Sequence, residues 1–263
     1  MLSLGPLQIN WYGFFVAFAM LVALFVTLKI GEKRKIKKDI LLDLFFWVIV
    51  FGVLGARLYD VILELPFYLK NPGQIIKIWE GGLAIHGGII AGLLVVIFFA
   101  KKTKISFWKL AAVSVPSLAL AQAIGRFGNY FNQELFGLPT NLPWGIPISQ
   151  INRPLEFLNE NYFHPTFIYE SFGSLIIFAI LIFITYKQLK AKGEEETSFD
   201  ILLVTLYMLL YSILRFSLEF IRIDYSPLIF GLRTPQAISL IMALTAIFIM
   251  TKTYVIQKKK ERL

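Results

Sequence analysis

Long apolar runs, separated by short charged or proline-containing segments, dominate this chain of 263 residues. A helix needs about 20 consecutive apolar residues to cross the hydrocarbon core of a bilayer. Seven stretches come close to this length, and each predicts one membrane-spanning helix. The predicted spans are residues 11–29, 41–63, 83–100, 107–125, 166–186, 199–220 and 235–254.

The composition supports the same fold class. Hydrophobic residues make up 57% of the chain, charged residues only 16%, and the mean hydropathy is +0.69. We therefore predict an all-α integral membrane protein, with residues 1–263 forming a single polytopic membrane domain. The chain has no cysteine, which excludes a disulfide framework, a thiolate metal site and a cysteine nucleophile of its own. The first ten residues lack a basic stretch, so the first run is expected to be a retained helix.

The basic residues predict the orientation. Eighteen of the 26 Lys and Arg follow the first, third, fifth and seventh runs, so seven spans place all of them on one side. Lys and Arg are enriched in cytoplasmic segments beside membrane helices. We therefore expect a cytoplasmic C-terminus and an N-terminus outside. This topology explains the net charge of +9, and nucleic acid is not expected as a partner.

Two of the predicted outer segments are longer than a hairpin. Residues 64–82 interleave apolar and aromatic side chains with Lys70 and Lys77, which is typical of an arm lying in the interface plane. Residues 126–165 contain several prolines and aromatic residues, which favour a small folded cap over a disordered loop. The predicted cytoplasmic loops are short and charged, so we expect them to be connectors.

Polar residues recur at the predicted outer ends of six of the seven spans. The block Gly-Arg-Phe-Gly-Asn-Tyr-Phe-Asn-Gln-Glu, residues 125–134, directly follows the fourth run, where a membrane helix is expected to meet water. On the sixth run, polar residues recur at spacings of four, four and three, which predicts one face of one helix. That set is Tyr211, Arg215, Glu219 and Arg222. The other outer ends carry Tyr12, Arg57, His86, Tyr169 and Glu170.

Each residue taken alone also has a structural explanation. An arginine at a helix end, such as Arg57 or Arg233, can extend to the interface. Arg215 and Glu219 can form a structural ion pair. A single histidine near an interface more often satisfies a hydrogen bond than acts as a base, and glycines beside it let helices pack closely. The common depth of all these groups is what favours a binding site.

Several arginines and a histidine at headgroup depth fit an anionic phospholipid as ligand. Guanidinium groups bind phosphodiesters through paired hydrogen bonds and stay charged when desolvated. Asn129 and Glu134 can hydrogen-bond a polar headgroup such as glycerol. The chain has only two histidines and no cluster of Asp and Glu at ligand spacing, so neither a metal nor another cofactor is expected.

The chain resembles the bacterial prolipoprotein diacylglyceryl transferases over nearly its whole length. The most specific block is the pattern Gly-Arg-x-Gly-Asn-x-x-Asn-x-Glu at residues 125–134. The other blocks are Trp11-Tyr12-Gly13, Gly55-Ala56-Arg57, His86-Gly87-Gly88, His164-Pro165-Thr166 with Tyr169-Glu170, and the Tyr211 to Arg222 series. They occur in the family's order and at similar distances.

The resemblance implies a transferase active in the first step of bacterial lipoprotein maturation. The family moves the diacylglyceryl group of phosphatidylglycerol to the thiol of a lipobox cysteine in a prolipoprotein. The product is a thioether, and glycerol phosphate leaves. The resemblance also implies a multi-pass protein of the bacterial cytoplasmic (inner) membrane, with its active site facing the outer leaflet. One chain supplies every motif, so a monomer would suffice.

The demands of that reaction suggest a role for each residue. Arg126 and Arg215 are expected to stabilise the charge on the leaving oxygen, and His86 to accept the proton of the thiol. Glu219 and Arg222 are expected to orient Arg215. The other expected substrate-binding residues are Tyr12, Gly87, Asn129, Glu134, Gly137 and Tyr211.

Two other classes of protein compete with the transferase. A carrier or flippase for an anionic lipid would place its charges near the bilayer midplane, within repeated halves, and the chain shows no such repeat. A purely structural membrane subunit would leave the cost of the intramembrane Arg and Glu unexplained.

Overall fold

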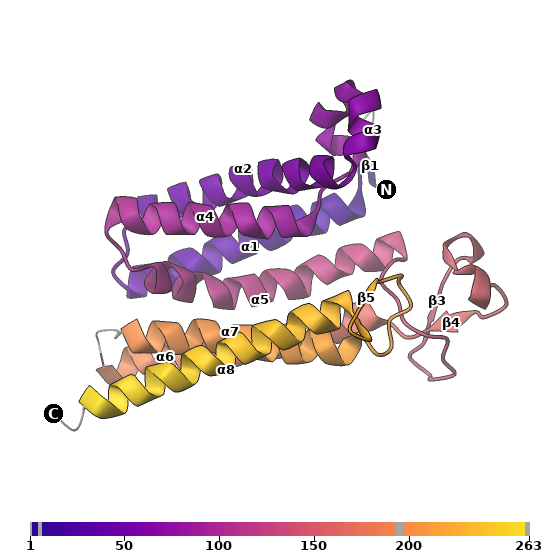
Figure 1. The fold of residues 1–263 in the computed structure, drawn as a ribbon. Helices are drawn as coiled ribbons and strands as arrows, with labels where there is room; N and C mark the ends of the chain where they lie inside the picture. The colour runs from indigo at the N-terminus through magenta and orange to yellow at the C-terminus, as the bar shows by residue number, and fades with distance from the viewer. Residues whose placement is uncertain (1, 5–6, 193–196, 261–263) are drawn as a thin grey trace. The chain divides into compact units, whose positions relative to one another are not determined.

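A computed structural model describes residues 2–4, 7–192 and 197–260 (Figure 1). Within these ranges, seven helices are long and apolar enough to cross a membrane, which confirms the all-α membrane fold. They are α1 (Trp11–Lys33), α2 (Lys38–Leu63), α4 (Ile85–Thr103), α5 (Phe107–Asn132), α6 (Thr166–Lys192), α7 (Thr197–Leu218) and α8 (Thr234–Lys260). No more than 44% of the most apolar window of any span is buried within the protein, so most of these side chains face outward, as lipid contact requires.

One predicted helix end is wrong in a way that matters for the polar residues. The fourth span was expected to end at residue 125, but α5 continues to Asn132. Phe127 and Phe131, four residues apart, lie on one face of α5. Their ring centroids lie 5.9 and 5.5 Å from that of Phe15 on α1. This aromatic packing extends the helix through the polar block. The ends of the other spans lie at their predicted positions or up to two helical turns away from them.

The contacts divide the chain into two compact units. One consists of Met1–Thr27 with Ala112–Leu263, and the other of Leu28–Ala111.

In the first unit, α7 packs against both α6 and α8. At the α6–α7 crossing, a Cβ atom on Gly173 would lie 2.5 Å from Leu214 Cδ1. A larger residue would therefore have to displace the Leu214 side chain. The part of α1 in this unit lies along α5, where the hydroxyls of Thr27 and Ser117 are 2.5 Å apart.

Residues 133–165 form a folded segment of the same unit. Strand β3 (Ile146–Pro147) pairs antiparallel with β4 (Tyr162–Phe163), and two short 3₁₀ turns, η3 (Gln150–Asn152) and η4 (Leu155–Phe157), lie between them. A small buried cluster of Phe136, Ile148 and Phe163 is the segment's own core.

Two hairpins complete this unit. Strands β1 (Leu2–Leu4) and β2 (Leu7–Ile9) pair before α1. Strands β5 (Leu228–Ile229) and β6 (Leu232–Arg233) pair between α7 and α8. The Thr234 hydroxyl donates to the Pro227 carbonyl at 2.8 Å and closes the base of the second hairpin. This closure holds Arg233 at the start of α8.

In the second unit, α2 and α4 pack backbone to backbone at one end. A Cβ atom on Gly87 would lie 2.2 Å from the Gly55 carbonyl oxygen, and a Cβ on Gly55 would lie 2.7 Å from the carbonyl oxygen of Gly87. Only glycine permits this approach at both positions.

Residues 64–82 belong to the same unit and contain α3 (Leu65–Lys70), η1 (Pro72–Ile76) and η2 (Ile78–Glu80). Arg57 of α2 holds this segment. Its guanidinium donates four hydrogen bonds of 2.5 to 2.9 Å to main-chain carbonyls, which are those of Gln74, Ile75, Gly81 and Gly82. Its Nη1 is 3.7 Å from Asp60 Oδ2, so this buried arginine organises the segment from within.

Tyr68 of α3 completes the attachment. Its hydroxyl donates to Asp60 Oδ2 at 2.7 Å, and this hydrogen bond to the carboxylate raises the pKa of the phenol. The Arg57 guanidinium carbon lies 5.0 Å from the centre of the Tyr68 ring, a cation–π distance.

We predict that Arg57→Ala frees residues 65–82 from α2. Losing even one hydrogen bond to a charged group costs about 1.5–3 kcal/mol, so amide exchange in this segment should accelerate on the order of 10- to 100-fold, as measured by hydrogen–deuterium exchange. Lys77→Ala is the control, because the ion pair of Lys77 with Glu80 is exposed on both sides and such pairs contribute about 0–1 kcal/mol. Unchanged exchange in Arg57→Ala would contradict the role of Arg57.

Candidate active site

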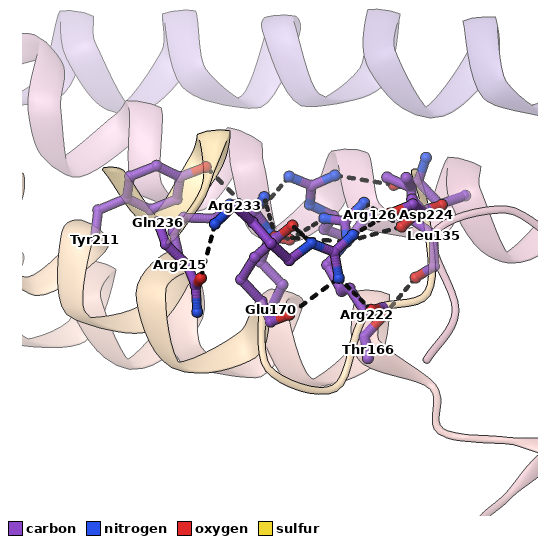
Figure 2. Close-up of polar contacts among 12 residues, drawn as sticks. Arg126, Leu135, Thr166, Glu170, Tyr211, Arg215, Arg222, Asp224, Arg233 and Gln236 are labelled. Carbon is purple, nitrogen blue, oxygen red and sulfur yellow. Dashed lines mark hydrogen bonds and ion pairs between the residues drawn. The ribbon is translucent and has the colours of Figure 1, made fainter. Parts of the chain in front are cut away.

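Four arginines gather around two buried glutamates, Glu170 and Glu219, in the unit that contains α5 to α8 (Figure 2). The arginines are Arg126 of α5, Arg215 of α7, Arg222 beyond the end of α7, and Arg233 of β6. These residues are far apart in sequence, and the packing of α7 against α6 and α8 brings several of them together.

Glu170 of α6 is the centre of the cluster and is only 2% exposed. Its Oε1 is 2.5 Å from Arg126 Nη2, and its Oε2 is 3.1 Å from Arg215 Nη1. Arg222 Nη1 lies 3.9 Å from the same Oε2, and the Tyr211 hydroxyl donates to Oε1 at 3.4 Å. One carboxylate therefore positions three guanidinium groups.

Glu219 is equally buried and links the other side of the cluster. Its Oε2 is 3.4 Å from Arg215 Nη2, the contact that the four-residue spacing predicts. Its Oε1 is 3.1 Å from Arg233 Nε. Arg215 is thus held between Glu170 and Glu219, each of which also contacts a second arginine.

Arg222 does not continue the face of α7, and the prediction that it does is wrong. The helix ends at Leu218, and Arg222 forms an isolated antiparallel bridge with Gly137. Extended pairing replaces the helix here, since the Leu138 amide donates to the Ile221 carbonyl at 2.9 Å. The side chain of Arg222 nevertheless turns back to the cluster.

Arg233 folds the linker between α7 and α8. Its guanidinium donates to the main-chain carbonyls of Glu219 at 3.3 Å, of Arg222 at 2.5 Å, and of Asp224. Asp224 in turn accepts from Arg222 Nε at 2.9 Å. Arg233 is therefore tied into the cluster rather than extended to a membrane interface.

Gly137 serves the packing of this linker. A Cβ atom there would lie 2.6 Å from the Ile221 carbonyl oxygen and 2.8 Å from Thr166 Cγ2. No larger residue fits without moving main chain. The structure thus explains a glycine at this position by close packing, and its role in substrate binding stays a prediction.

A second chain of hydrogen bonds supports Arg126 from its own helix. Arg126 Nη1 donates to Asn129 Oδ1 at 3.3 Å, and Asn129 Nδ2 donates to Glu134 Oε1 at 2.7 Å. Gln133 and Leu135 have φ angles of +49° and +57°, a left-handed conformation that costs non-glycine residues about 1–2 kcal/mol each. This turn ends α5 and brings Glu134 back to Asn129.

The two predicted tyrosines have different surroundings. Tyr211 stacks on Tyr207, with ring centroids 5.9 Å apart, and its hydroxyl meets Glu170. Tyr12 packs against α5, where a Cβ atom on Gly128 would lie 2.8 Å from Tyr12 Cδ2. Gly128 of the polar block is thus required by the approach of Tyr12.

His86 and Gly87 belong to the other unit, in the first turn of α4. His86 is exposed, and the centre of its ring lies 6.1 Å from that of Tyr59. Gly87 is buried at the crossing with Gly55. Both residues therefore stay predictions as parts of the active site.

The accessibility of the cluster favours an anionic ligand. The side chains of Arg126 and Arg215 are 21% and 14% exposed, whereas that of Glu170 is 3% exposed. The Glu170 carboxylate is thus closed off, while the two arginine side chains are partly exposed. The four arginines, Glu170, Glu219 and Asp224 carry one net positive formal charge. The fold and site define a polytopic membrane protein with a positively charged arginine cluster suited to a phosphate.

Comparison with known proteins identifies the family. The family model for prolipoprotein diacylglyceryl transferase matches residues 1–252, and the chain belongs to this family. It is 40% identical over 240 residues to a phosphatidylglycerol–prolipoprotein diacylglyceryl transferase of Nostoc sp., covering 91% of this chain and 83% of that relative. A relative of the same name from Synechocystis sp. is 40% identical over 258 residues, covering 98% of this chain and 90% of that relative. One from Acaryochloris marina is 42% identical over 237 residues, covering 90% and 84%.

The sequence alone assigned no role to three members of the cluster. Glu170 was grouped with the other polar residues at the outer helix ends, Arg233 had extension to the interface as a structural explanation, and Asp224 was not singled out. Charge balance would have pointed to Glu170, because several arginines at one depth of a membrane require buried carboxylates. Nothing in the sequence pattern indicates that Arg233 folds back over the linker.

Proposed function

We propose that this chain transfers the diacylglyceryl group of phosphatidylglycerol to the lipobox cysteine of a prolipoprotein. The observation that carries the proposal is the pair Arg126 and Arg215, which share one buried carboxylate and whose side chains stay partly exposed. Membership of the transferase family and the names of the relatives support the same substrates.

In this reaction the cysteine sulfur forms a bond to the glycerol carbon that bears the phosphate ester. The bond from that carbon to the ester oxygen breaks, and glycerol phosphate leaves with the electron pair. Negative charge therefore grows on the leaving phosphate. Arg126 and Arg215 neutralise this charge, and their existing bonds to Glu170 mean that little reorganisation is needed.

The net charge of the cluster fits this ligand. A phosphodiester carries one negative charge, which balances the single positive charge left by the four arginines and three carboxylates.

Glu219 and Arg222 orient Arg215, and Asn129 with Glu134 supports Arg126. The other proposed headgroup contacts are Tyr12, Gly87, Gly137 and Tyr211, with Asn129 and Glu134 contributing hydrogen bonds.

The thiol must lose its proton to attack. A free cysteine thiol has a pKa of about 8.5 and reacts as the thiolate. We assign His86 as the group that accepts this proton, because it is exposed and lies in the first turn of α4 and because histidine is the side chain that most often acts as a general base.

The membrane orientation follows from the distribution of charge. The basic helix ends face the cytoplasm, so the N-terminus and the arginine cluster face the outer side of the bacterial inner membrane. Residues 64–82 then form an external interfacial arm and residues 126–165 contribute an external cap. Donor lipid and exported precursor meet on that side, and one chain is sufficient.

Arg126→Ala and Arg215→Ala should each lower the transfer rate by about 10²–10³-fold, because each removes a donor to the leaving phosphate. The assay mixes purified protein, phosphatidylglycerol and a lipobox peptide, and detects the diacylglyceryl mass gain on cysteine. Lys109→Ala is the matched control, since Lys109 lies on α5 like Arg126 but at its other end. Near-normal turnover in either folded arginine variant would refute the assignment, and no mass gain with the unmodified protein would refute the function.

His86→Gln tests the base separately. If His86 accepts the thiol proton, the substitution should lower the rate by about 10²-fold or more and flatten its dependence on pH between about 6 and 8. Binding of phosphatidylglycerol should be retained, because the arginines are untouched. A variant that keeps most of its activity across this pH range would show that another group activates the thiol.

A further inference from the structure

A concave site lies between α2 and α4, wholly within the unit of residues 28–111. It is a groove of about 500 Å³ and is apolar apart from one charged residue, Lys102. Its lining residues are Trp47, Phe51, Ala91, Leu94, Val95, Phe98, Phe99 and Lys102. None of them belongs to the arginine cluster or to the proposed transfer reaction.

Glycines of α4 bring it close to α2 at the end of the helix pair away from Lys102. A Cβ atom on Gly87 would lie 2.2 Å from the Gly55 carbonyl oxygen, on Gly88 3.3 Å from the Gly52 carbonyl oxygen, and on Gly92 3.7 Å from Val48 Cγ1. The two helices are therefore in main-chain contact at Gly55 and Gly87. The groove lies beyond this crossing, among the larger side chains nearer the end of α4 that carries Lys102.

The length of the groove matches one leaflet of a bilayer. Ala91 and Lys102 are eleven residues apart on α4, which corresponds to about 16 Å of helix. The hydrocarbon core of a bilayer is about 30 Å thick, so one leaflet contributes about 15 Å. The groove therefore extends from the middle of the membrane to the level of the headgroups, the path of a single acyl chain.

A lysine, Lys102, lies at the end of the groove that is level with the headgroups. Lys102 is in the last turn of α4, with its Nζ 6.0 Å from the centre of the Phe99 ring. Among the described residues, no carboxylate forms an ion pair with it. Its charge is therefore available to a phosphate. Basic pockets at the cytoplasmic ends of membrane helices are a common way of binding anionic headgroups.

We propose that this groove binds one acyl chain of an anionic phospholipid whose phosphate lies at Lys102. Under the proposed orientation, this lipid belongs to the inner leaflet, opposite the leaflet of the donor lipid. The apolar lining holds the chain, and Lys102 selects a net negative headgroup over a zwitterionic one. One lysine near the membrane surface contributes about 1 kcal/mol, which is about a fivefold preference.

The fluorescence of Trp47 can report an acyl chain in the groove, since Trp47 lines the groove and is 40% exposed. The protein is reconstituted in phosphatidylcholine vesicles without any peptide acceptor. One series contains an increasing fraction of phosphatidylglycerol brominated on its acyl chains, and the other contains an increasing fraction of phosphatidylcholine brominated in the same way. Bromine quenches tryptophan emission on contact. The difference between the unmodified protein and Trp47→Phe isolates the emission of Trp47 from that of the other tryptophans.

We expect brominated phosphatidylglycerol to quench Trp47 at about one fifth of the fraction that brominated phosphatidylcholine requires. Lys102→Gln should abolish this preference and Lys102→Arg should keep it. Lys101→Gln is the matched control, because Lys101 neighbours Lys102 but does not line the groove. Equal quenching by both lipids would overturn the proposal. A preference that survives in Lys102→Gln, or that disappears equally in Lys101→Gln, would overturn it as well.

Discussion

The sharing of Glu170 among three arginines is the interaction on which the candidate site depends. A buried carboxylate in a membrane protein is costly unless it is paired, and so is each guanidinium group. Glu170 meets both requirements by contacting Arg126 and Arg215 with separate oxygens. The arginines are thereby fixed side by side while their side chains stay partly exposed. A phosphate then meets donors that are already in place, which is the condition for electrostatic catalysis.

The partly buried arginines of this protein find hydrogen-bond partners in two ways. Arg57 uses its donors on main-chain carbonyls and thereby folds a segment of its own unit. Arg233 behaves similarly toward the linker before α8. Arg126 and Arg215 instead contact carboxylates and keep part of their surface open. The same residue type thus fixes main-chain segments where carbonyls accept its hydrogen bonds and joins the charged cluster where buried carboxylates accept them, and Arg233 does both.

Hydropathy was sufficient to predict the seven spans, because each helix has to match the thickness of a bilayer. It failed where tertiary contacts decide the helix ends. Stacking of Phe127 and Phe131 on Phe15 carries α5 through the polar block, and pairing with Gly137 draws Arg222 out of α7. Spacing on one helix predicted the contact of Arg215 with Glu219. It could not predict Glu170 as the second partner of Arg215, since that contact joins different helices.

The central claim is that Glu170 holds the arginines in position, and the most direct measurement is a double-mutant cycle. The free energy of unfolding is measured for the unmodified protein, Glu170→Gln, Arg126→Gln and the double variant. We predict a coupling energy above about 1 kcal/mol, because the Glu170 carboxylate is 2% exposed and lies 2.5 Å from the guanidinium. Effects that add to within about 0.5 kcal/mol would contradict the claim.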